Sequence, residues 1–122
     1  KQSNPVLLSP KAANLFKSIA STNRYSIETP LYYQGQVPIV VYYVIKGTIL
    51  LMDKNKIQQT RGKGSILGHK ELLLNISSKF TAKALHDTEV CYIDKSTLIE
   101  ISKSTDSELQ FLYKELKNTI TH

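Results

Sequence analysis

The sequence GSILGHKELLLNISSKFTAKA, residues 64–84, places a helix-forming string inside a region of β-forming segments. Residues 68–74 combine three leucines with a lysine and a glutamate, which favours about two turns of helix. From residue 79 to residue 93 the β pattern resumes, because Phe80, Ala82 and Ala84 share one parity of an extended segment. A short helix inserted between strands is therefore predicted at 68–74.

Upstream of this segment, from about residue 25, β-forming strings alternate with turn residues. LYYQG at 31–35 and VYYVIKG at 41–47 each end in glycine, and the polar turn DKNK at 53–56 separates two further strings at 48–52 and 57–60. Tyr, Val and Ile favour strands, whereas Gly, Asn and Asp favour turns. Short strands at this spacing predict a barrel or a sandwich.

Both ends of the chain have helical patterns. Ser9 followed by Pro10 predicts a capped helix over 9–20. Near the other end, Asp94 can cap a helix over 95–103, and Thr105 with Glu108 has the spacing of a capping box that opens a helix over 105–120. The last helix has one apolar stripe, formed by Leu109, Leu112, Tyr113, Leu116 and Ile120. A β-barrel or β-roll flanked by helices, an α+β fold, buries all of these apolar faces.

Composition limits the classes of protein to consider. The chain has 122 residues, one cysteine, and 16 basic against 10 acidic side chains, a net charge of +6. This length predicts a single domain, 1–122. A lone cysteine excludes an internal disulfide scaffold, and the lack of a long apolar run predicts no membrane contact and a cytoplasmic location. The lysines are dispersed from Lys11 to Lys117 rather than clustered, so no direct nucleic-acid contact is expected within these residues.

No enzymatic pattern is present, and we predict neither catalytic residues nor a metal site. The three histidines, His69, His86 and His122, have no second ligand at metal-binding spacing. Cys91 lies in an apolar strand-like run, where a buried and inert thiol is the expected state. The pattern at 64–84 instead favours an anion, since a glycine that opens a helix after a strand lets backbone N–H groups approach a phosphate.

With these motifs in view, residues from about 8 to 116 resemble the cyclic nucleotide-binding domain family. The resemblance rests on Gly35, on YYVIKGTILL at 42–51, on GKGSILG at 62–68 and on FTAKALHDTEVCYID at 80–94. It implies an antiparallel eight-stranded β-roll, jelly-roll-like, over 25–93. The inserted helix 68–74 would then belong to a phosphate-binding cassette, with one helix before the roll and two after it.

The resemblance also implies a ligand site, and two of its anchors are replaced here. Gly68 takes the family's glycine place, but His69 stands in the place of the glutamate that bonds the ribose, and Ser78 in that of the arginine that pairs with the phosphate. Neither replacement supplies a carboxylate or a guanidinium. The candidate ligand-binding residues are Gly68, His69, Lys70, Glu71, Leu72, Ser78, Lys79 and Thr81.

Several of these residues have two interpretations. Lys70 and Lys79 could each bring a positive charge to an anion, although solvation is the favoured interpretation for Lys79. His69 either donates a hydrogen bond to a ligand or fills space in an unused pocket. The tyrosines at 32–33 and 42–43 either stack on a base or divide between core and surface. The apolar stripe of 105–120 either packs on this domain or forms a self-association seam.

Two functional hypotheses follow. The first is a non-catalytic regulatory module with weak or lost binding of cyclic AMP or cyclic GMP, which acts in signalling through a protein partner or a homodimer formed through residues 105–120. The alternative is a functional sensor of a cyclic nucleotide or another small anion, in which the ligand repositions the C-terminal helices. No cofactor is expected beyond that candidate ligand.

Overall fold

The computed structural model describes residues 7–120. Within these residues, four helices and eight strands follow one another in the order helix, five strands, a two-residue strand, helix, two strands and two helices. The helices are α1 (Pro10–Ile19), α2 (His69–Leu74), α3 (Lys95–Lys103) and α4 (Ser107–Asn118). The strands are β1 (Ser21–Tyr25), β2 (Thr29–Tyr32), β3 (Val40–Lys46), β4 (Ile49–Asp53), β5 (Lys56–Arg61), β6 (Ile66–Leu67), β7 (Thr81–Ala84) and β8 (Thr88–Asp94).

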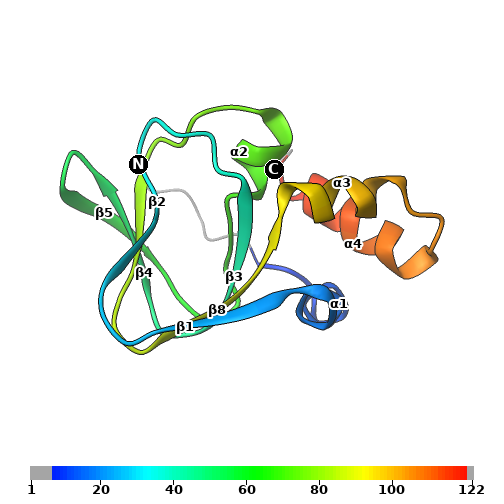
Figure 1. The fold of residues 1–122 in the computed structure, drawn as a ribbon, viewed down its shortest axis with the longest axis horizontal. Helices are drawn as coiled ribbons and strands as arrows, with labels where there is room; N and C mark the ends of the chain where they lie inside the picture. The colour runs from blue at the N-terminus through cyan, green and yellow to red at the C-terminus, as the bar shows by residue number, and fades with distance from the viewer. Residues whose placement is uncertain (1–6, 121–122) are drawn as a thin grey trace.

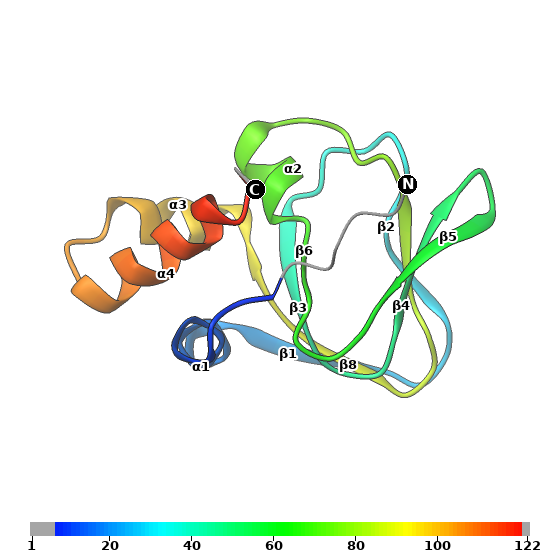
Figure 2. The ribbon, with the colours of Figure 1, turned by 180° about the vertical axis from the view of Figure 1, so that it is seen from behind.

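The strands form two antiparallel four-stranded sheets that enclose a roll. One sheet has the order β1-β8-β3-β6 and the other the order β2-β7-β4-β5. In Figure 1 the roll occupies one half of the molecule, α1, α3 and α4 lie beside the first sheet, and α2 lies between the roll and the C-terminal helices. The reverse view in Figure 2 shows the same arrangement. The predicted α+β fold, an eight-stranded β-roll with an inserted helix, is confirmed.

The first sheet separates two hydrophobic cores, because successive side chains of a strand point to opposite faces. On β3, Val41 and Tyr43 pack against the helices, whereas Tyr42 and Val44 face the inside of the roll. This alternation explains why almost every residue of the strand is apolar. Within the helix-side core, Phe16, Leu112 and Leu116 are fully buried, so the two leucines of the α4 stripe pack on this domain itself.

The helix ends follow the predicted caps, with one correction. Ser9 caps α1 and accepts a hydrogen bond from the Ala12 amide, and Asp94 caps α3. The capping box predicted for Thr105 and Glu108 is wrong. The N-cap is Asp106, whose carboxylate accepts hydrogen bonds from two first-turn amides, so α4 runs over Ser107–Asn118 rather than 105–120. A carboxylate is a stronger acceptor than the threonine hydroxyl for these amides and also favours the positive helix end.

The roll begins earlier than the predicted residue 25. Strand β1 starts at Ser21 and pairs along its length with β8. Its sequence, STNRY, is polar and its first four residues are exposed. This exposed edge strand has no alternation of apolar and polar residues, so hydrophobic periodicity does not predict it. Pairing with β8 holds this strand in place. None of the helices within residues 7–120 is long and apolar enough to cross a membrane.

Candidate functional site

Helix α2 is set on the roll by Gly68, which forms its N-terminal boundary directly after β6. The glycine has φ +86°, and a Cβ at this position would lie 2.7 Å from the Val40 carbonyl oxygen of β3. Both features exclude larger residues, since a left-handed backbone and a contact this short each disfavour a side chain. Gly68 therefore fixes how closely α2 approaches the first sheet.

His69 turns toward the last helix. The imidazole is 4% exposed, and its Nε2 lies 2.8 Å from the Thr119 hydroxyl oxygen at the end of α4. That hydroxyl donates its one proton to the Leu116 carbonyl at 2.7 Å, so His69 must be the donor, from Nε2–H. Within residues 7–120, its buried Nδ1 has no hydrogen-bond partner. Burial, and secondarily the Lys70 ammonium, lowers the pKa of His69 to about 4.

The next three residues of α2 have three different environments. Lys70 is exposed to solvent, and Leu72 is buried in the helix-side core. Glu71 is half-buried, and its charge raises the pKa of the Tyr32 hydroxyl on β2. Of the predicted residues on α2, Glu71 is thus the one whose side chain acts on the roll interior.

The loop after α2 holds Ser78 firmly. Its buried hydroxyl donates to the Phe80 carbonyl at 2.7 Å and accepts from the Phe80 amide at 3.1 Å. Lys79 is exposed. Thr81 alternates with the buried Ala82 of β7 and therefore faces outward, where its hydroxyl accepts a hydrogen bond from the Gln34 amide at 2.9 Å. The predicted ligand residues are consequently distributed over the helix side, the roll and the outer surface.

A pocket of about 290 Å³ opens beside the inside of the roll, and we call it the roll pocket. Tyr32 and Tyr42 line it with nearly parallel rings, 6.4 Å between centroids and 29° between planes. Tyr33, by contrast, is 54% exposed. Of the neighbouring tyrosines 32 and 33, the first therefore lies in the core and the second on the surface. The lining is formed by Leu31, Tyr32, Gln36, Val37, Pro38, Ile39, Val40 and Tyr42.

Charged and polar groups act on the Tyr32 hydroxyl. Burial raises its pKa, Glu71 and Tyr42 raise it further, and the Arg61 guanidinium and the Ser78 hydroxyl oppose this change. Arg61, the last residue of β5, is only 8% exposed, and its guanidinium donates to the Thr60 carbonyl and the Gln59 side chain. Burial raises the pKa of Tyr32 but lowers that of the Arg61 guanidinium, because it disfavours the charged form of each group.

Sequence reasoning missed Arg61. The residues that share its parity on β5 are Ile57 and Gln59, and Ile57 is exposed. This strand therefore offers no apolar alternation that would assign Arg61 to the inside of the roll. Only the curvature of the roll, which brings the end of β5 toward β2, reveals that a guanidinium acts on Tyr32.

A family model matches the part of the chain that forms the roll, the inserted helix α2 and helix α3. The model of the cyclic nucleotide-binding domain matches residues 22–105, more than half of the chain. The chain belongs to this family. The search of curated proteins gives no match.

Solved structures share the fold of this cyclic nucleotide-binding domain at low sequence identity. The catabolite activator protein of Thermus thermophilus superposes with a TM-score of 0.70 at 20% identity, covering 93% of this chain and 52% of that protein. A putative cyclic nucleotide-binding protein from Geobacter metallireducens gives 0.68 at 15% identity, covering 93% and 86%. A structure from work on a cyclic-GMP-dependent pathway of bacterial phytopathogenesis gives 0.77 at 15% identity, covering 95% and 96%. The chain thus spans about half the length of the Thermus protein.

Within residues 7–120 no group of three or more His, Cys, Asp or Glu side chains is placed to hold a metal ion. Cys91 is buried, and burial raises the pKa of its thiol to about 11, so it is protonated near neutral pH. The side chains that line the roll pocket are apolar apart from the two tyrosines and Gln36.

Proposed function

We propose that this domain is a non-catalytic regulatory module of cytoplasmic signalling that lacks strong binding of cyclic AMP and cyclic GMP and acts through protein contacts. The observation that carries the proposal is the direction of His69. The residue in the family's glutamate place donates its hydrogen bond to Thr119 of α4 and not to the roll interior. The first of the two ligand anchors has become a contact between α2 and α4.

The second anchor supports the same proposal. Ser78, in the family's arginine place, uses its hydroxyl on the backbone of Phe80 and brings no positive charge. A missing charge-assisted hydrogen bond weakens binding by roughly 1.5–3 kcal/mol, or about one to two decades of affinity. The exposed Lys79 beside it is free to extend into solvent, which disfavours it as a replacement anchor.

Isothermal titration calorimetry tests the proposal. The native domain is titrated with cyclic AMP, cyclic GMP and cyclic dinucleotides, and we expect no saturable heat at micromolar concentrations. The Ser78→Arg variant should gain affinity for cyclic mononucleotides, and adding His69→Glu should increase the gain. Ser77→Arg is the matched control. Because Ser77 is exposed, this substitution adds the same charge outside the roll. Micromolar binding of a cyclic mononucleotide by the native domain would overturn the proposal.

The protein contacts would use side chains of α4 that the core leaves accessible. Leu112 and Leu116 are buried in the domain's own core, whereas Phe111 and Tyr113 are only half-buried. Light scattering coupled to size exclusion measures self-association over a concentration series. A homodimer weakened by Phe111→Ser identifies residues 105–120 as the seam, and a monomer at all concentrations assigns the role to a different partner.

A second candidate function, a sensor of a small anion, is favoured by the buried guanidinium. Tyr32 lines the roll pocket, and Arg61 and Glu71, which do not line it, both act electrostatically on the Tyr32 hydroxyl. A ligand that carries an anionic group and hydroxyls and extends past Tyr32 would meet a partner of each kind. The same calorimetric series distinguishes the two functions. Binding by the native domain that is lost in Arg61→Gln but retained in Ser78→Ala supports the sensor.

A further inference from the structure

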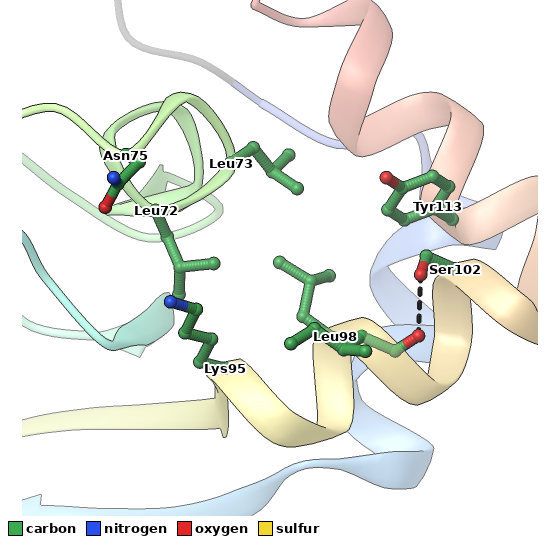
Figure 3. Close-up of a pocket in the computed structure, with 8 residues that line it drawn as sticks. Leu72, Leu73, Asn75, Lys95, Leu98, Ser102 and Tyr113 are labelled. Atoms are coloured by element: carbon green, nitrogen blue, oxygen red, sulfur yellow. Dashed lines mark hydrogen bonds between the residues drawn. The ribbon is translucent and has the colours of Figure 1, made fainter.

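A second pocket, of about 350 Å³, lies between α2 and the C-terminal helices, and we call it the helix pocket. Its walls come from all three helices, as Figure 3 shows. It is separate from the roll pocket, since no residue lines both. The lining is formed by Leu72, Leu73, Asn75, Lys95, Leu98, Ile99, Ser102 and Tyr113.

Apolar and polar groups are segregated within the helix pocket. Figure 3 shows Leu72, Leu73 and Leu98 grouped in the middle of the space. Lys95 lies at the side near Leu72, and the Tyr113 hydroxyl points inward from the opposite side, toward Leu73. A volume of this size with an apolar body and a few polar groups at its margin is typical of a small-molecule site.

The charged side chain in the lining of this pocket is the exposed Lys95. No acidic side chain lines it, and within residues 7–120 no carboxylate lies within ion-pair distance of the Lys95 ammonium. The adjacent Asp94 carboxylate caps α3, where it accepts hydrogen bonds from the Thr97 amide and the Ser96 hydroxyl and forms no ion pair with Lys95. Lys95 is also the first residue of α3, where the helix dipole disfavours a cation. An anion beside Lys95 would relieve both unfavourable features.

From this arrangement we propose that the helix pocket binds a small amphipathic carboxylate, an aryl or alkyl acid. Its apolar body packs among Leu72, Leu73 and Leu98, and its carboxylate pairs with Lys95. Because such a molecule touches α2, α3 and α4 together, it binds only when the helices keep this arrangement and therefore favours it. The site would thereby give the domain an input at the C-terminal helices, through residues that do not line the roll pocket.

The probe for the test is 3-phenylpropionate, with 3-phenyl-1-propanol as its uncharged counterpart. Nitrogen-15 chemical-shift mapping of the native chain should show saturable shifts with the acid, concentrated in residues 72–75, 95–102 and 113. The alcohol should bind roughly tenfold more weakly, because it forms no charge-assisted hydrogen bond. Lys95→Met should reduce binding of the acid by a similar factor and leave binding of the alcohol unchanged.

Two further variants control the test. Lys103→Met removes an exposed charge from the same helix but from outside the pocket, and should leave binding of the acid unchanged. Ser102→Phe places a ring at the exposed rim of the pocket and should abolish binding of acid and alcohol alike. Absence of shifts at 10 mM probe, equal affinity for acid and alcohol, or equal losses in the two lysine variants would each overturn the proposal.

Discussion

Protonation of His69 should govern the acid stability of this domain. The imidazole is buried and donates from Nε2 to Thr119, so a second proton would have to sit on Nδ1, where residues 7–120 provide no acceptor. The folded pKa of about 4 lies below the ordinary value of 6.5. The unfolded chain therefore binds the proton more readily, and acid favours unfolding.

The magnitude follows from the two pKa values. A fall from 6.5 in the unfolded chain to about 4 in the folded one corresponds to about 3 kcal/mol of unfolding free energy, because each tenfold change in proton affinity is about 1.4 kcal/mol. This contribution is fully present above pH 6.5, declines as the pH falls and is lost near pH 4. It is a large fraction of the stability of a domain of this size.

Urea unfolding followed by far-ultraviolet circular dichroism, at fixed ionic strength between pH 7 and pH 4, measures the effect. The native chain is compared with His69→Gln, which retains a donor to Thr119 but does not titrate, so that carboxylate contributions cancel in the difference. His86→Gln is the control, since His86 is exposed. If the native and His69→Gln curves run parallel over this range, or if carbon-detected NMR gives His69 a pKa near 6.5, the reasoning is wrong.

Three other predictions concern the fold. In urea unfolding, Gly68→Ala should destabilise the domain by about 3 kcal/mol or more, and Gly35→Ala by only about 1 kcal/mol. Both glycines have positive φ, but of the two only Gly68 lies against a neighbouring backbone. Asp106→Ala should cost about 1 kcal/mol in thermal unfolding, whereas Thr105→Ala should be nearly neutral, since Asp106 supplies the cap. The Cys91 thiol, with its pKa raised to about 11, should react with a disulfide reagent at pH 8 only after denaturant is added.

Local patterns predicted the fold in most of its parts. The caps at Ser9 and Asp94, the inserted helix after Gly68 and the near-continuous apolar run of β3 are all readable from neighbouring residues. They are readable because a cap, a left-handed glycine or a strand parity depends on interactions a few residues apart. Strand β1 escaped prediction for the converse reason, as its polar residues are held only by β8.

The candidate site was predictable only in part. The family resemblance implies that His69 and Ser78 stand in the glutamate and arginine places. It could not show that the His69 side chain points to α4, because α4 begins only at Ser107 and is brought to α2 by folding. The hydrogen bond from His69 to Thr119 spans 50 residues, and no local pattern encodes it.

By itself the amino-acid sequence therefore determined most of the helices and strands, although not β1, and the chemical types of the residues in the segment 64–84. The tertiary structure alone decided the rest: the burial of Arg61 inside the roll, the outward position of Thr81 and the position of Lys95 beside an apolar cavity. The physical reason is the range of the forces involved. Propensities and caps act within one helical turn, whereas burial and charge pairing depend on residues that only folding brings together.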